Sequence, residues 1–145
     1  MHTKIIAGHE LTPGKTIKDH IHVEGTELRV PHVLLCGQHP GATVLISAGI
    51  HNAEYVGIQA AIELSNELDV SELHGNVIIL PLANRSGFEN RTMSMVYEDG
   101  KNLNRVFPVT GMAVRQTGWR ICFLRFSSGM WMHISICTAV TDTSL

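Results

Sequence analysis

Two short apolar runs rich in β-branched residues constrain the fold of this chain more than any other feature. They are ATVLISA at residues 42–48 and NVIILPL at residues 76–82. Continuous apolar runs of this length are typical of strands that are buried on both faces of a parallel sheet. Apolar residues between the two runs recur near helical spacing, so we expect a helix over residues 53–68. Strand, helix and strand in this order predict a right-handed crossover that joins two parallel strands.

The first 41 residues predict further strands that extend this sheet. Residues 16–23 alternate between polar and apolar side chains, and residues 27–36 form another extended run. Pro31 within that run indicates a sheet edge or a bend, because proline cannot donate to a ladder. Residues 3–7 read as a short strand, and residues 38–41 (QHPG) as a turn. The expected fold class is α/β, with a mixed, partly parallel sheet flanked by helices.

Composition narrows the class of protein. A chain of 145 residues, 44% hydrophobic and 17% charged with a net charge of −2, fits one domain with one core. These values exclude a disordered chain and a strongly basic nucleic-acid-binding protein. No apolar run suits a signal peptide or a membrane span. Three widely spaced cysteines indicate a reducing compartment, so we expect a cytoplasmic protein with neither nucleic acid nor membrane as partner.

The first candidate site follows the first apolar run. In open α/β sheets, ligands bind beyond the carboxyl ends of the strands. His51 and Glu54 lie there, directly after Gly49, and their spacing of three places both side chains on one side of the first helical turn. Zinc accepts imidazole nitrogen and carboxylate oxygen, and two histidines with a glutamate form one catalytic ligand set. Because H-x-x-E is a short pattern, ordinary polar residues at a helix start are the competing interpretation.

The second candidate site follows the second apolar run. Residues 81–92 and 99–108 contain several arginines and asparagines in polar loops with glycine. A guanidinium binds a carboxylate through two parallel hydrogen bonds, and a neighbouring asparagine can fix the orientation of the ligand. The competing interpretation is solvated loop charge, which fits most loop arginines.

Three motifs together resemble the succinylglutamate desuccinylase/aspartoacylase family, zinc enzymes related to the zinc carboxypeptidases. They are GIHNAE at residues 49–54, LPLAN at 80–84 and DGKNLNRVFP at 99–108, in the order of the family. The resemblance covers about residues 1–108. It implies a zinc-exopeptidase-like fold, present here only as the N-terminal part of the catalytic domain. It also implies a zinc-dependent deacylase that hydrolyses the amide or ester bond of small N-acyl amino acids.

The resemblance also implies roles for single residues. His51 and Glu54 match the first two zinc ligands, and Asn104 and Arg105 match the pair that holds a substrate carboxylate. Arg91 is the best match to the arginine that polarises the scissile carbonyl. The expected chemistry is zinc-activated water, a glutamate general base, and an oxyanion stabilised by zinc and arginine. The family usually has proline where this chain has Arg85, so this loop departs from the pattern of the family.

Two parts of the expected site have no match. The family supplies its third zinc ligand from a later D-L-H-S-G-like segment, and its general-base glutamate lies further downstream. After Arg105 the only histidine is His133, in a different context, and no glutamate follows Glu98. We therefore expect an inactive or impaired enzyme. A non-catalytic, truncated remnant or weak metal-binding module is the alternative, and a zinc carboxypeptidase is a further one that NLNRVFP disfavours.

Residues 109–145 form an atypical tail, which we interpret as the product of a shifted reading frame. They contain both tryptophans but only one acidic residue. The run Met130-Trp131-Met132 requires the codons ATG TGG ATG. If the frame is shifted so that the last base of each codon becomes the first base of the next, these bases and the following His133 codon encode V-D-A. The codons that follow are then compatible with Y-I-D-L-H-S-G-D. The competing explanation is a tail that supplies His133 to the metal. Because the tail is apolar without a clear period, we also expect self-association through exposed apolar surface.

Overall fold

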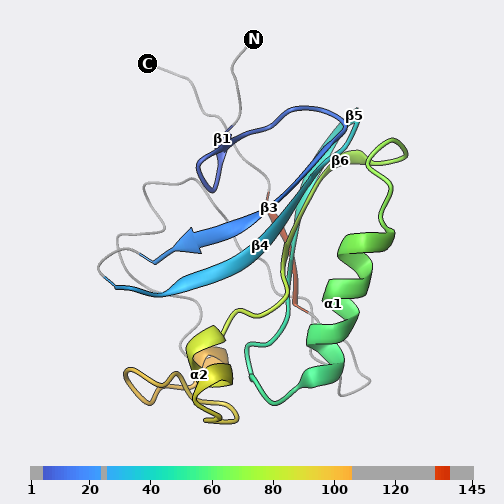
Figure 1. Ribbon diagram of the computed structural model, residues 1–145. Helices are drawn as coiled ribbons and strands as arrows, with labels where there is room; N and C mark the ends of the chain where they lie inside the picture. Colours follow the sequence, from blue (N-terminus) through green and yellow to red (C-terminus); the bar gives the residue numbers. More distant parts are fainter. Residues whose placement is uncertain (1–4, 24–25, 106–132, 138–145) are drawn as a thin grey trace.

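The core of the computed structural model is a mixed sheet with one helix packed along it (Figure 1). The model describes residues 5–23, 26–105 and 133–137. The five strands of this sheet are β3 (Lys15–His22), β4 (Arg29–Cys36), β5 (His39–Ser47), β6 (His74–Leu80) and β7 (His133–Cys137). Their order is β3-β4-β6-β5-β7; β5 and β6 are parallel, and the other neighbours are antiparallel. The predicted mixed, partly parallel sheet is confirmed.

The helix α1 (Tyr55–Glu67) connects the two parallel strands, as the apolar runs predict. It begins two residues later than expected, because Glu54 has the non-helical backbone angles φ −83° and ψ 64°. The predicted turn over residues 38–41 is wrong in part, since β5 already starts at His39. Its pairing with β6 shifts in register between His39 and Thr43. Pro40 and Gly41 lie within that irregularity, where the missing N–H of proline removes one ladder hydrogen bond.

The sheet separates two apolar clusters, whereas the composition predicted a single core. The cluster on the side of α1 has the buried residues Val33, Leu35, Ile46, Ala48, Ala61 and Ile79. The cluster on the other side has the buried residues Ile6, Leu34, Cys36 and Ile78. Alternate residues of β4 enter opposite clusters because successive side chains of a strand point to opposite faces. This strand is therefore buried on both sides over its second half.

A small hairpin covers part of the second cluster. It consists of β1 (Ile5–Ile6) and β2 (His9–Glu10), which form a two-stranded antiparallel sheet, and it lies across the main sheet from α1 (Figure 1). Its turn uses positive φ angles at Ala7 (50°) and Gly8 (82°). Ile6 is 3% exposed and packs in the second cluster. The strand predicted over residues 3–7 is thus present in its described part.

The position of Pro31 agrees with the predicted sheet edge. Pro31 pairs with His20 of β3, but β6 pairs with β4 only from Val33 to Cys36. Among the described residues, the first half of β4 therefore has a neighbour on one side only. A proline is tolerated there because no ladder hydrogen bond is required of it.

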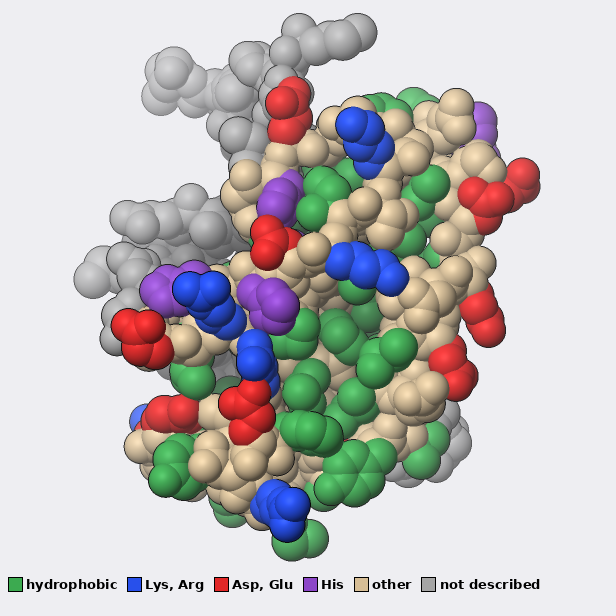
Figure 2. Space-filling view, in the orientation of Figure 1, with side chains coloured by type: hydrophobic (Ala, Val, Ile, Leu, Met, Phe, Trp, Pro, Cys, Tyr) green, Lys and Arg blue, Asp and Glu red, His purple; other side chains and the backbone are tan. Residues whose placement is uncertain are grey.

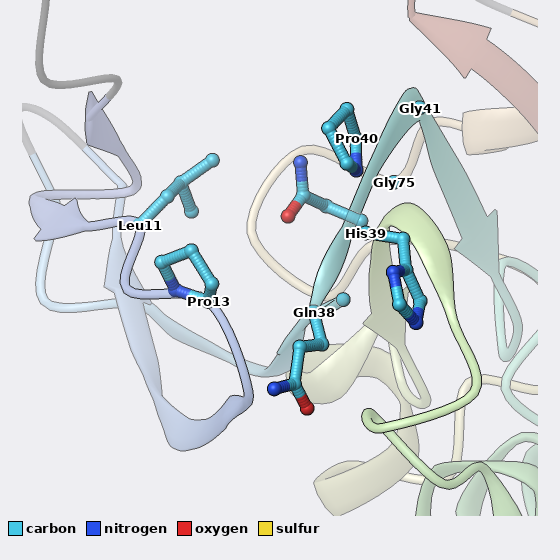
Figure 3. A pocket seen from close by; sticks show the side chains of 9 residues that line it. Leu11, Pro13, Gln38, His39, Pro40, Gly41 and Gly75 are labelled. Atoms are coloured by element: carbon cyan, nitrogen blue, oxygen red, sulfur yellow. The ribbon is translucent and has the colours of Figure 1, made fainter. Parts of the chain in front are cut away.

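A pocket of about 310 Å³ lies at the amino ends of β5 and β6, away from the loop of His51. Figure 3 shows Leu11 and Pro13 facing Gln38, His39 and Pro40 across it. His39 is the only titratable side chain that lines this pocket. It therefore does not contain the predicted ligands.

In the described part of the chain, no helix is long and apolar enough to cross a membrane.

Candidate metal and substrate site

Two loops meet beyond the carboxyl ends of β5 and β6. The backbone N–H of Ala83 donates to Ala48 (2.9 Å), and that of Asn84 donates to Gly49 (2.9 Å). Gly49 has a φ of +63°, and a Cβ atom at this position would lie 2.9 Å from Leu82 Cδ1. The left-handed backbone conformation would be strained with a side chain, so glycine is favoured at this position. The close contact holds the loop of His51 against the loop that follows β6.

His51 and Glu54 form the centre of the candidate site. His51 Nδ1 lies 3.0 Å from Glu54 Oε1, so the spacing of three does bring the two side chains together. They meet in a turn that precedes α1, however, and not in the first helical turn as predicted, because the helix begins only at Tyr55. His51 Nε2 lies 3.1 Å from Oδ1 of Asn102, which comes from the loop before the short 3-10 helix η1 (Leu103–Arg105). The side chains of His51 and Glu54 are 23% and 39% exposed, so a solvated ion can reach both.

The hydrogen bonds around Asn102 assign the roles of the two His51 nitrogens. Asn102 Oδ1 also accepts the backbone N–H of Asn104 at 3.0 Å, so this oxygen is an acceptor toward His51 Nε2. A neutral His51 that donates from Nε2 has its lone pair on Nδ1, directed at the Glu54 carboxylate. Two acceptors at this distance require a cation between them, either a proton or a metal ion. Imidazole nitrogen and carboxylate oxygen suit zinc, and a carbonyl oxygen on the second ring nitrogen is the usual support of a zinc-binding histidine.

No third candidate ligand joins His51 and Glu54 among the side chains that the structure describes. They contain no group of three or more His, Cys, Asp or Glu side chains that could hold a metal ion. The segment from which we expect the third ligand falls in residues 109–145, of which only 133–137 are described. The backbone of His133 pairs with Ser47, so β7 starts beside the end of β5 that leads to His51.

A buried asparagine, Asn84, supports the candidate site, and in the sequence it stands out only as the last residue of LPLAN. Asn84 is 2% exposed and caps the short helix α2 (Arg85–Glu89) by accepting the N–H of Gly87 at 3.1 Å. Its amide donates to Asn52 Oδ1 at 3.2 Å and to the carbonyl of Met95 at 3.0 Å. Asn84 thereby connects the His51 loop, α2 and the loop after α2. Burial of a polar residue cannot be read from one sequence, which is why this role was missed.

The residues predicted to bind substrate differ in whether hydrogen bonds connect them to His51. Asn104 is joined to His51 through Asn102. Arg105 ends η1 and is exposed. Arg91 is also exposed, in the left-handed conformation at φ 57°, and its guanidinium has no hydrogen bond or ion pair with the described residues. Both arginines are therefore exposed among the described residues. Arg85 instead forms an ion pair with Glu89 at 2.7 Å.

Exposed apolar side chains gather around the same loops. Of the large hydrophobic residues that are exposed in the described part of the chain, all but Val23 and Ile62 belong to this group. The group, here called the apolar rim, consists of Tyr55, Val56, Phe88, Met93, Met95 and Tyr97. Hydrophobic side chains also reach the surface in the lower part of Figure 2, around α2. The rings of Tyr55 and Phe88 meet edge to face with centroids 6.0 Å apart, so α1 and α2 share this surface.

Comparison with known proteins agrees with the motifs. The model of the succinylglutamate desuccinylase/aspartoacylase catalytic domain matches residues 40–120, more than half of the chain. A curated relative, the N-alpha-acetyl-L-2,4-diaminobutyric acid deacetylase of Halomonas elongata, is 43% identical over 70 residues. That alignment covers 47% of this chain and 20% of the relative.

Solved structures show the same fold over part of their length. An aspartoacylase family protein from Mesorhizobium loti matches with a TM-score of 0.59 and 32% identity, over 74% of this chain and 33% of that protein. An ectoine utilization protein from Ruegeria pomeroyi, solved with product bound, matches with a TM-score of 0.57 and 25% sequence identity. This match covers 68% of this chain and 32% of that protein. The chain therefore spans about a third of these structures and a fifth of the curated relative. The chain belongs to the succinylglutamate desuccinylase/aspartoacylase family.

Proposed function

We propose that this chain carries the first part of the metal site of a zinc-dependent deacylase acting on the amide or ester bond of small N-acyl amino acids. The observation that supports this most is the facing pair of His51 Nδ1 and Glu54 Oε1, with Asn102 behind the histidine. Family membership supports the reaction class, and the Halomonas relative is by name an N-acetyl amino acid deacetylase.

The proposal assigns a separate role to each of these residues. His51 and Glu54 would hold zinc, and Asn102 orients the imidazole so that Nδ1 faces the ion. Bound zinc lowers the pKa of a coordinated water and polarises the scissile carbonyl. Arg105, with Asn104 beside it, is suited to bind the carboxylate of the amino acid through paired hydrogen bonds. Arg91 is placed in this proposal at the carbonyl oxygen, where a cation stabilises the developing negative charge.

We further propose that the chain as given is inactive or impaired. A catalytic zinc site has three protein ligands and a general base nearby. Only two ligands face each other among the described residues, and the sequence has no glutamate after Glu98. Residues 1–108 would then be the N-terminal part of a catalytic domain and residues 109–145 a tail read in a shifted frame. The family match itself continues to residue 120.

The coding DNA and an activity assay test this proposal together. The codons of residues 130–141 should encode D-L-H-S-G when each last base is carried forward, and codons that cannot do so would refute the shifted frame. The chain as given should release no amino acid from N-acetyl amino acids. A gene with the frame restored should do so in a zinc-dependent way. Hydrolysis by the given chain would refute the proposed impairment, and an inactive, zinc-loaded restored protein would refute the deacylase function.

A further inference from the structure

His32 is a deeply buried titratable side chain that the candidate site does not use. It lies on β4, is 1% exposed, and neither ring nitrogen has a hydrogen-bond partner among the described residues. Its strand alternation places it on the same face as Leu34 and Cys36, in the row of the second apolar cluster. A buried polar group without a partner costs free energy, and its persistence calls for an explanation.

The surroundings of His32 connect the hairpin to the main sheet. On β2, the ring of His9 lies against the ring of His32, with centroids 5.6 Å apart and a tilt of 40°. On β3, Asp19 is the register partner of His32. His9 Nε2 forms an ion pair with Asp19 Oδ2 at 3.1 Å. The hairpin is thus held to the sheet by the Ile6 contact in the core and by this group of three side chains, here called the histidine latch.

We propose that the histidine latch is a proton-sensitive release, which frees the β1–β2 hairpin from the sheet when His32 takes up a proton. A charged His32 cannot stay in an apolar cluster without hydrogen bonds. The neighbouring His9 also disfavours a charge on His32. Lifting the hairpin gives the His32 ring access to water while the rest of the sheet remains paired.

The charges near His32 set the direction of the response. Burial lowers the pKa of His32 below its ordinary value of 6.5, and the charge of His9 lowers it further. Asp19 acts in the opposite sense, and His20 on β3 lowers the pKa slightly. The second cluster, which lies on the same face of β4 as His32, consists of apolar residues. Since the folded pKa lies below the unfolded one, stability is full above pH 6.5 and is lost as the pH falls below it.

Asp19 does not account for a transition in that range. The backbone N–H of His20 donates to its carboxylate and lowers its pKa below the ordinary 3.8, an effect that the nearby His9 reinforces. The carboxylate therefore stays charged throughout mildly acidic conditions. A loss of protection that begins below pH 6.5 would therefore not come from Asp19.

Hydrogen exchange of the full chain tests this inference. We expect the amides of residues 5–11 to lose protection by about tenfold for each unit of pH below the unfolded pKa, after correction for intrinsic exchange, while α1 changes little. The variant His32→Leu should keep the hairpin protected at both neutral and acidic pH. The control His22→Gln changes an exposed histidine of β3 and should behave as the original chain does. Equal protection at both pH values, or an unchanged loss in His32→Leu, would overturn the proposal.

A second measurement uses the original chain alone, so its result does not depend on whether a variant folds. The ring protons of His32 can be titrated by NMR in the original chain, beside the amides of the hairpin. The proposal predicts that both report the same transition below pH 6.5. A hairpin that moves without titration of His32, or titration of His32 without any change in the hairpin, would refute it.

Discussion

Asn102 Oδ1 lies 3.1 Å from His51 Nε2, a contact between residues 51 positions apart in the sequence. The same oxygen accepts the N–H of Asn104 at 3.0 Å. One amide group therefore connects the proposed zinc-binding histidine to the segment that we assign to the substrate carboxylate. The GIHNAE and NLNR segments are thus in direct contact in the fold.

Removal of Asn102 should weaken zinc binding without unfolding the chain. Loss of a partner behind a metal-binding histidine typically costs ten- to a hundredfold in affinity, so we expect a loss in this range for Asn102→Ala. Calorimetric titration with zinc measures it. The control Asn66→Ala removes an exposed asparagine that bonds only to Lys18 and should bind zinc as before. Equal affinity of the Asn102 variant and the original chain would contradict the role assigned here.

Removal of Asn84 should destabilise the chain. The variant Asn84→Ala leaves the N–H of Gly87 and the oxygen of Asn52 without their buried partner. Each such loss costs roughly 1–3 kcal/mol, so we expect the free energy of unfolding in urea to fall by about 2 kcal/mol or more. Asn90→Ala is the matched control, because this exposed residue gives up a single bond to Ser86 and should cost less than about 1 kcal/mol. Similar losses for the two variants would contradict the account.

Cys36 should react slowly with alkylating agents. It is 1% exposed, and burial raises the pKa of its thiol above the ordinary 9.0. Because the folded pKa exceeds the unfolded one, the thiol contributes stability that is lost as the pH rises above 9.0. Peptide mapping after iodoacetamide treatment should find Cys36 largely unmodified in buffer and fully modified in urea. Rapid modification of the folded chain would show that the second cluster is open.

The apolar rim should promote self-association. Val56 and Met93 are 71% and 68% exposed, and large exposed apolar patches mark sites of association. We expect the double variant Val56→Ser/Met93→Ser to reduce the apparent mass in concentration-dependent light scattering. Ile62→Ser, on an exposed position of α1 outside the rim, is the control and should leave the mass unchanged. A chain that is monomeric at all concentrations would refute this prediction.

Local pattern predicted much of the fold. The two apolar runs and the helical spacing between them are strong signals, and β5, α1 and β6 follow them within a few residues. The irregular start of β5 at His39 could not be predicted, because QHPG is a good turn sequence and only the pairing with β6 extends it. The division into two clusters also depends on strand order, which no local pattern contains.

Only the part of the candidate site that is local in sequence could be predicted. His51 and Glu54 are only three residues apart, in a turn that precedes α1, so spacing alone brought them together. The contacts of Asn102 and Asn84 join loops that are distant in the sequence, and they depend on how β5 and β6 pair. Those contacts became visible only with the fold.

Zinc binding by the chain and its His51→Ala variant tests the central claim most directly. After removal of metal with a chelator, we expect the original chain to take up zinc at a single saturable site and His51→Ala to take up none. His22→Ala, at an exposed histidine of β3, should retain the original binding. Failure of the original chain to bind zinc, or unchanged binding by the His51 variant, would contradict the assignment of His51 and Glu54 as metal ligands.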